Sequence, residues 1–228
     1  MTDGRRDDEV VLVVAKAPVA GQAKTRLIPR YGAQTAAALA GAALIDTVRT
    51  ARASGARVVV ALRGRIADAA DAQRLDDVLT ECTVIRQRGN DFGERLTNAH
   101  LDVAADGARK VIQIGMDTPQ ISVADLRAGL RATRPGTAVL GPAYDGGWWA
   151  VGLYGGRGAE SIAAVPMSRE DTGEQTADSL RAVGLDVRRI RALGDVDRPE
   201  DVDVIARQCG RHSEFAALAQ RCSPGRNC

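Results

Sequence analysis

The sequence predicts one α/β domain built on a mostly parallel, mixed sheet with helices on both faces. Short runs of β-branched and apolar residues alternate with longer segments of helical periodicity, which is typical of parallel strands joined by crossover helices. The expected strands cover residues 10–15, 57–62, 83–87, 110–115, 138–142, 148–153 and 186–190. The expected helices cover residues 33–54, 66–79, 92–105, 123–133, 170–183 and 199–207.

Local signals support the individual elements. The first strand is a continuous apolar run, VVLVVA, as in strands buried on both faces. The helix over 33–54 has apolar residues at helical spacing and stops before Gly55. The link between the fifth and sixth strands is too short for a helix, so these two strands are expected to be antiparallel. Pro199 stands near the first turn of the last helix.

Composition excludes several classes of protein. The 228 residues include 31 Lys+Arg and 29 Asp+Glu, a net charge of +2 that argues against a general nucleic-acid or membrane-surface binder. The start of the chain is polar, and no apolar run approaches the ~20 residues of a membrane span. We therefore expect a cytoplasmic protein, with residues 1–9 disordered, a single domain over 10–208 and a C-terminal tail over 209–228. The sequence does not indicate an oligomeric state.

Cysteine and histidine are too sparse to suggest a zinc site. The four cysteines form no CxxC pair, and the chain has two histidines. Any catalysis is therefore expected to depend on carboxylates, cations and a metal ion.

The loop after the first strand is the strongest candidate site, because ligands of open parallel sheets bind beyond the carboxyl ends of the strands. It carries Lys16, Lys24 and Arg26 around Gly21, a set suited to binding a polyphosphate. Lys16 and Lys24 are two of only three lysines in the chain. The spacing matches neither a P-loop nor a dinucleotide fingerprint. The alternative is a solvated basic loop.

Polar clusters also follow later strands. After the third, the segment from Gln87 to Arg95 could contact a base or ribose, or cap the next helix. After the fourth, Asp117 stands before Pro119, where a phosphate-bound divalent ion would be held, although an Asx-turn would explain it too.

Two further groups are weaker signals. The segment Asp145-Gly146-Gly147-Trp148 allows close approach of a ligand, and is equally compatible with a tight hairpin. Asp195 and Asp197 could reach the ion at Asp117, or Asp197 could cap the last helix.

Together these residues resemble the bacterial DUF2064 family. The match covers roughly residues 10–206 in order. It rests on the motifs Lys16-x-Pro18-x-x-Gly21-x-x-Lys24-Thr25-Arg26-Leu27, Gly93-Glu94-Arg95, Gly115-x-Asp117-x-Pro119, Gly141-Pro142-x-x-Asp145-Gly146-Gly147 and Asp195-Val196-Asp197-x-Pro199-Glu200-Asp201. Members are often labelled glycosyltransferases, and the family is similar to the GT-A, or nucleotide-diphospho-sugar transferase, superfamily.

The first loop also resembles those of 2-phospholactate and molybdenum cofactor guanylyltransferases. Met116 and Trp148-Trp149 depart from the family's usual Ser and Tyr-containing pair.

The resemblance implies a three-layer αβα, Rossmann-like GT-A fold that binds a nucleotide with Mg²⁺ or Mn²⁺. The implied catalytic residues are Lys16, Lys24, Arg26 and Asp117. The implied nucleotide-binding residues are Ala15, Lys16, Pro18, Gly21, Lys24, Thr25, Gln87, Gly93, Glu94 and Arg95. Acceptor binding falls to Asp145, Gly146, Gly147 and Trp148. The implied metal ligands are Asp117 and Asp197, with Asp195 as the alternative second ligand.

Two reactions fit such a site. In nucleotidyl transfer, a small phosphorylated or hydroxyl acceptor attacks a nucleoside triphosphate and pyrophosphate leaves; the cationic loop favours this reaction. In glycosyl transfer, the donor is a nucleotide sugar; the family label favours this one. A non-catalytic nucleotide-binding module is the third possibility.

Overall fold

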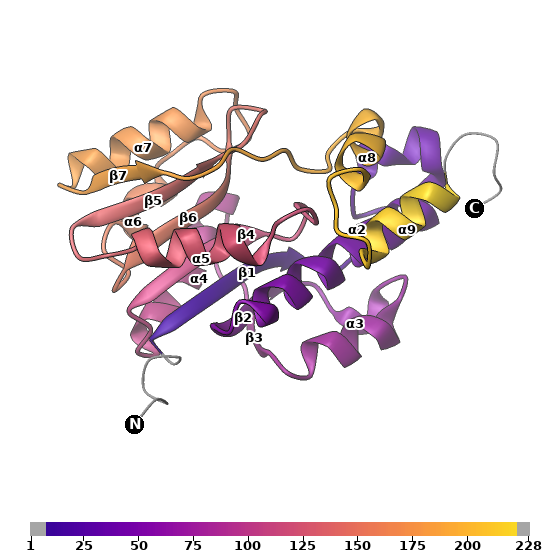
Figure 1. Ribbon diagram of the computed structural model, residues 1–228, viewed down its shortest axis with the longest axis horizontal. Coiled ribbons are helices and arrows are strands. Elements are labelled where there is room, and N and C mark those ends of the chain that lie inside the picture. The colour runs from indigo at the N-terminus through magenta and orange to yellow at the C-terminus, as the bar shows by residue number, and fades with distance from the viewer. Residues whose placement is uncertain (1–7, 223–228) are drawn as a thin grey trace.

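The computed structural model describes residues 8–222 and contains a seven-stranded sheet in the order β3-β2-β1-β4-β6-β5-β7 (Figure 1). The strands are β1 (Glu9–Lys16), β2 (Arg57–Arg63), β3 (Thr83–Arg86), β4 (Lys110–Gly115), β5 (Thr137–Pro142), β6 (Trp148–Tyr154) and β7 (Asp186–Arg189). Strand β6 runs antiparallel to both of its neighbours, and the other pairings are parallel. The predicted mixed, mostly parallel sheet is thus confirmed.

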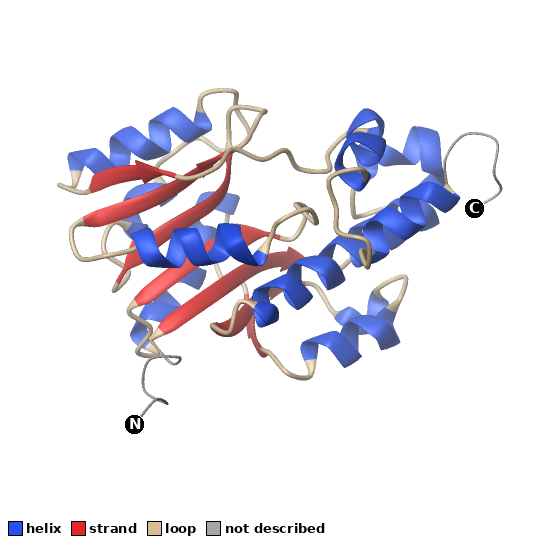
Figure 2. Ribbon diagram, in the orientation of Figure 1, coloured by secondary structure: helices blue, strands red, loops and turns tan. Residues whose placement is uncertain are grey.

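Helices cover both faces of the sheet, which gives the three layers visible in Figure 2. They are α2 (Ile28–Ala53), α3 (Ala72–Leu79), α4 (Phe92–Ala105), α5 (Val123–Ala132), α6 (Ala159–Ala163), α7 (Thr172–Ala182), α8 (Pro199–Ala206) and α9 (Glu214–Arg221), with 3-10 turns η1 (Thr25–Leu27) and η2 (Ile66–Asp68). Helices α2, α3 and α5 share one hydrophobic core with the sheet, and α4, α6 and α7 pack on the opposite face.

Strand β1 shows why the first apolar run is continuous. Val11 and Val13 belong to the core under α2 and α5, whereas Leu12 and Val14 belong to the core under α4. Successive side chains of a strand point to opposite faces, so a strand covered on both sides needs apolar residues at every position. The result is a central strand whose carboxyl end is held firmly where the candidate loop begins.

The C-terminal segment differs from the expected tail over 209–228. Residues 214–221 form α9, and Phe215 is fully buried against α2 and α8. The carboxylate of Asp46 accepts hydrogen bonds from Ser213 Oγ and from the backbone of Glu214 and Phe215. Ser213 also caps α9. A capping serine followed by apolar residues at helical spacing is the sequence signal for this helix.

At the other end, Glu9 already belongs to β1, and residues 1–7 of the segment expected to be disordered lie outside the described residues. No helix in the described range 8–222 combines the length and the apolar character needed to cross a membrane.

Candidate functional site

A cleft of about 990 Å³ lies at the carboxyl ends of β1 and β4. Its walls come from the loop after β1, the turn after β4, the start of β6, the segment before α7 and the segment before α8. These segments are far apart in sequence, and the sheet brings them together because the carboxyl ends of neighbouring parallel strands share one edge.

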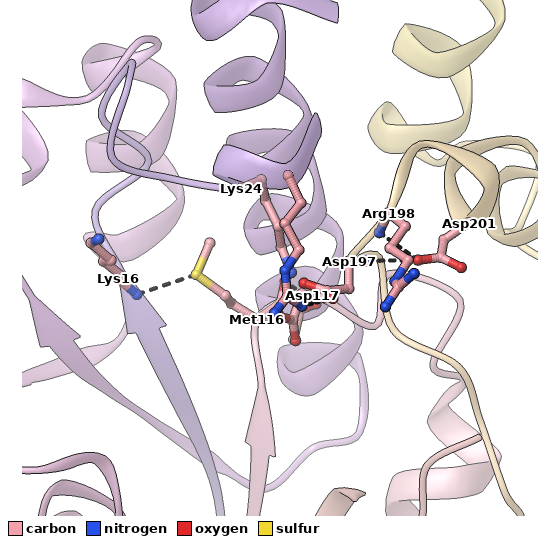
Figure 3. A network of polar contacts seen from close by, with 9 residues as sticks. Lys16, Lys24, Met116, Asp117, Asp197, Arg198 and Asp201 are labelled. Atoms are coloured by element: carbon pink, nitrogen blue, oxygen red, sulfur yellow. Dashed lines mark hydrogen bonds and ion pairs between the residues drawn. The ribbon is translucent and has the colours of Figure 1, made fainter. Parts of the chain in front are cut away.

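Backbone geometry directs the Lys24 side chain into this cleft. Lys24 adopts a left-handed conformation, with φ of 46°, immediately before η1. Its Nζ atom donates to Asp117 Oδ2 at 2.7 Å (Figure 3). Left-handed backbone at a non-glycine residue is uncommon and often marks a functional site. The loop therefore holds Lys24 against the aspartate that follows β4.

The Lys16 side chain remains within its own loop. Its Nζ donates to the carbonyl oxygen of Gln22 at 2.7 Å, and its backbone N–H donates to the Met116 sulfur at 3.2 Å (Figure 3). The thioether of Met116 thus bridges the ends of β1 and β4. Lys16 has no carboxylate within ion-pair distance among the described residues, so its charge is available to a ligand.

Several carboxylates lie close to Lys24 in the cleft. Burial raises the pKa of Asp195 to about 6, with Asp117 as its strongest carboxylate neighbour and Lys24 acting in the opposite direction. Burial lowers the pKa of Lys24, but Asp117, Asp195 and Asp197 more than offset this, so the net shift is upward. Asp195 and Asp117 therefore share one electrostatic site, with the Lys24 ammonium between the loop and the acids.

Asp197 is held differently. Its side chain pairs with Arg26, and its backbone N–H donates to Asp201, which also accepts from the Arg198 N–H at the start of α8 (Figure 3). Both Arg26 and Asp197 are substantially exposed. Asp197 therefore already has a cationic partner at the rim of the cleft.

The donor set suits a hard divalent cation that binds together with phosphate. Mg²⁺ and Mn²⁺ favour oxygen ligands, and Mg²⁺ commonly takes one or two carboxylates plus phosphate oxygens. Asp117 and Asp195 supply such a pair, and their mutual repulsion is what a cation would relieve. Within residues 8–222, no three acidic, histidine or cysteine side chains converge into a ready-made cluster, so ligands from a bound substrate would have to complete the coordination.

The structure brings most of the predicted site residues to the cleft. Those that line it are Ala15, Lys16, Lys24, Thr25, Arg26, Gln87, Arg95, Asp117, Asp145, Gly147, Trp148, Asp195 and Asp197. Gln87 has a structural task as well, because its Nε2 donates to the carbonyl oxygens of Ala15 and Ala61, both at 2.8 Å.

Other predicted residues do not line the cleft, and helix capping or helix packing explains two of them. Glu94 accepts from the Asn90 N–H, while its own N–H donates to Asp91, so both acids cap α4. A Cβ at Gly93 would lie 2.9 Å from the Ala163 carbonyl oxygen, which accounts for the glycine by helix packing. The remaining members of this group are Pro18, Gly21 and Gly146.

The structure also adds residues that the sequence analysis does not select. They include Arg63, Phe92, Leu96, Gln113, Met167, Ser168, Arg169, Glu170, Thr172 and Arg198. Only Gln113 gives a clear sequence signal, as a polar residue inside the apolar strand KVIQIG. Residues 167–170 lie in an irregular segment, where no periodicity indicates which side chains face a cleft.

The two tryptophans of β6 point to opposite faces of the sheet. Trp149 is buried in the core under α5, and its Nε1 donates to the Arg191 carbonyl oxygen. Trp148 packs on the α4 face, lines the cleft and donates to Thr176 on α7. Both tryptophans line the cleft, and Trp148 is the one that also packs against the α4-side core.

Comparison with solved structures shows that this is the fold of nucleotide-diphospho-sugar transferases. A putative nucleotide-diphospho-sugar transferase from Desulfovibrio desulfuricans is 25% identical, with a TM-score of 0.84 over 93% of this chain and 94% of the other. Rv0371C from Mycobacterium tuberculosis, in complex with manganese, is 20% identical, with a TM-score of 0.54 over 87% and 97%. CMP:2-keto-3-deoxy-manno-octonic acid synthetase, complexed with CTP, is 14% identical, with a TM-score of 0.51 over 93% and 99%.

The chain belongs to the family DUF2064, described as an uncharacterized protein conserved in bacteria, whose pattern matches residues 45–169. The resemblance seen in the motifs is thereby confirmed. No curated protein matches the sequence significantly.

Proposed function

We propose that this protein is a metal-dependent nucleotidyltransferase that moves a nucleotidyl group from a nucleoside triphosphate to a small phosphorylated or hydroxyl acceptor and releases pyrophosphate. The observation that carries the proposal is the contact of the Lys24 loop with Asp117 across one cleft. Cations for a polyphosphate and carboxylates for a divalent ion meet there at the carboxyl ends of β1 and β4.

The charge of the cleft favours a triphosphate over the diphosphate of a nucleotide sugar. Among the described lining residues, seven cationic side chains face five acidic ones. The cations are Lys16, Lys24, Arg26, Arg63, Arg95, Arg169 and Arg198, and the acids are Asp117, Asp145, Glu170, Asp195 and Asp197. A bound divalent ion would add to this positive excess, which suits the more highly charged donor.

We assign a role to each set of residues that lines the cleft. Lys16, Lys24 and Arg26 would neutralise the triphosphate and the departing pyrophosphate. Asp117 and Asp195 would hold Mg²⁺ or Mn²⁺, which when bound polarises phosphate oxygens. Gln87 and Arg95 would lie toward the nucleoside, and Asp145, Gly147 and Trp148 toward the acceptor. The manganese complex and the CTP complex among the structural neighbours are consistent with these two ligands.

Glycosyl transfer from a nucleotide sugar is the second candidate, favoured by the neighbour described as a putative nucleotide-diphospho-sugar transferase. The two reactions break different bonds. Nucleotidyl transfer joins the acceptor to the α-phosphorus and releases pyrophosphate, whereas glycosyl transfer leaves a nucleoside diphosphate.

Calorimetry with the four common NTPs and a set of nucleotide sugars, each with and without Mg²⁺, tests the choice. We expect metal-dependent binding of an NTP by the native chain and its loss in Asp117→Asn. Pyrophosphate release in the presence of NTP and a mixture of phosphorylated acceptors would support the reaction. Preference for a nucleotide sugar without pyrophosphate release would overturn it in favour of glycosyl transfer.

A further inference from the structure

A buried glutamine on β4 lacks hydrogen-bond partners. Gln113 interrupts an otherwise apolar strand, and its side chain is only 1% exposed. Neither its Oε1 nor its Nε2 makes a hydrogen bond with any described residue. Leaving a buried polar group unpaired costs about 1–3 kcal/mol, so such a group in a folded protein calls for an explanation.

The neighbour of this amide is equally unusual. His100 on α4 is fully buried, and neither ring nitrogen meets hydrogen-bond geometry with a described residue. Burial lowers the pKa of His100 to about 4, and its interaction with the Gln113 side chain acts in the opposite direction. The imidazole is therefore neutral at pH 7, and no hydrogen bond of normal geometry joins it to the amide.

Gln120 shows what a structural buried glutamine looks like in this chain. It is 6% exposed, and its Nε2 donates to the Gly194 carbonyl oxygen at 2.8 Å, which ties two loops together. Across residues 8–222, Gln113 and His100 are the residues whose side-chain polar atoms are all buried and unpaired. Gln113 thus differs from a glutamine that is kept for stability.

Gln113 borders the cleft on the sheet face that α4 covers. It does so together with Leu96, Trp148 and Met167, and we call this group of four the side chamber. Leu96 belongs to the core under α4, and Trp148 and Met167 are partly buried against that core. The side chamber therefore has apolar walls and one amide.

The polar groups next to the side chamber already make hydrogen bonds within the protein. Trp148 Nε1 donates to Thr176 Oγ1, and that hydroxyl donates to the Thr172 carbonyl oxygen. Thr172 Oγ1 donates to the Pro166 carbonyl oxygen. Of these groups, the Gln113 amide is the one with both a donor and an acceptor left for a ligand.

We propose that Gln113 determines acceptor specificity, with its amide binding the hydroxyl of a small alcohol whose apolar body packs against Leu96, Trp148 and Met167. The proposal rests on the proposed function, since it assigns an acceptor class to the same cleft. A hydroxyl both donates and accepts one hydrogen bond, which matches the two unpaired atoms of the amide.

A nucleobase suits the side chamber less well. Its edges carry several donors and acceptors, and in a chamber with one amide and apolar walls most of them would be buried unpaired. The nucleoside is better placed toward the β3 edge, where Gln87 and its bonded carbonyls lie at the carboxyl ends of β1 and β2.

The first test is stability, which needs no ligand. Gln113→Leu removes an unpaired amide, so we expect a higher melting temperature than in the native chain. The matched control, Gln120→Leu, removes an engaged amide and should lower the melting temperature. A loss of stability in Gln113→Leu as large as in Gln120→Leu would show a structural glutamine and overturn the proposal.

The second test is binding, measured without nucleotide by the fluorescence of Trp148. The substitution Trp149→Phe leaves Trp148 as the only tryptophan of the chain. The probes are benzyl alcohol and cyclohexanol, each paired with toluene or cyclohexane. In the Trp149→Phe background we expect each alcohol to bind about tenfold tighter than its hydrocarbon, and Gln113→Leu to abolish or reverse that preference. Equal binding of alcohol and hydrocarbon, or no fluorescence change with either, would overturn the proposal.

The two hypotheses fail in distinguishable ways. Absence of NTP binding alongside selective alcohol binding would refute the nucleotidyltransferase and leave the side chamber standing. A change in NTP affinity or base preference in Gln113→Leu, without an effect on alcohols, would instead make the side chamber a nucleobase site and refute the acceptor assignment.

Discussion

The Nζ atom of Lys24 lies 2.7 Å from Oδ2 of Asp117, although 93 positions separate them in the sequence. The pair is partly buried, with side-chain exposures of 14% and 31%. In the absence of a ligand, the ammonium thus compensates the carboxylate that we assign to the metal. A bound metal and triphosphate would offer each member of the pair a new partner.

Lys24→Met should weaken triphosphate binding strongly, because it keeps most of the side-chain volume and removes the charge. A hydrogen bond to a charged group contributes about 1.5–3 kcal/mol, which corresponds to roughly 10- to 100-fold in affinity. Isothermal titration with an NTP and Mg²⁺ measures the change. Arg131→Ala, on the exposed side of α5, is the control and should leave the affinity unchanged. Equal effects of the two substitutions would mean that the loop is merely solvated.

The second metal ligand can be identified by comparing Asp195→Asn with Asp197→Asn. Asp195 is partly buried beside Asp117, whereas Asp197 is paired with Arg26 at the rim. We expect Asp195→Asn to weaken Mn²⁺ binding at least about tenfold in the presence of a non-hydrolysable NTP, and Asp197→Asn to weaken it by less than about threefold. Mn²⁺ titration followed by electron paramagnetic resonance gives both values. The reverse order would restore Asp197 as the ligand.

Much of this arrangement could be predicted from the sequence, because it depends on topology. Runs of apolar residues identified the parallel strands, and residues that follow such strands share one edge of the sheet. The proximity of Lys24 and Asp117 follows from this rule. The choice between Asp195 and Asp197 does not, since it depends on how an irregular segment turns before α8.

Residues that cap or pack a helix are the main source of error. Glu94 stands next to Arg95 in one short motif, yet Glu94 caps α4 while Arg95 lines the cleft. A sequence pattern does not separate the two roles, because both place polar residues directly after a strand. Gln113 is the opposite case, in which a polar residue within an apolar strand was visible but its lack of partners required the structure.

His100 should make the protein sensitive to mild acid. Its pKa is lowered to about 4 in the folded chain, whereas an unfolded histidine titrates near 6.5. As pH falls from 6.5 toward 4, the unfolded state therefore binds a proton that the folded state does not, and stability is lost. The expected loss is roughly 3 kcal/mol across that window.

The measurement compares urea unfolding at pH 7.5 and pH 4.5 in the native chain and in His100→Leu. We expect the variant to lose less stability between the two pH values, by roughly 2–3 kcal/mol. His212→Gln, which replaces an exposed histidine, is the control for the loss of an imidazole elsewhere in the chain. Parallel pH profiles of His100→Leu and the native chain would contradict the prediction.

Gly146→Ala should destabilise the protein for a steric reason unrelated to ligand binding. Gly146 has φ of 87°, and a Cβ there would lie 1.8 Å from the Glu170 carbonyl oxygen. The Gly146 carbonyl oxygen also accepts from the Gly173 N–H at 2.8 Å, so the turn before β6 cannot easily move away from α7. We expect a loss of roughly 3 kcal/mol or more, measured by urea unfolding.

Gly136→Ala separates the clash from the backbone conformation. Gly136 has a similar φ of 77°, but no atom lies within 4 Å of a Cβ built there. This control should therefore show only the cost of a left-handed alanine, about 1–2 kcal/mol. If the two variants lose equal stability, the contact with Glu170 contributes nothing, and Gly146 becomes again a candidate for close approach by the acceptor. A larger loss in Gly146→Ala would mean that the glycine is needed where the turn before β6 packs against the segment before α7. That packing holds the start of β6, where Trp148 lies.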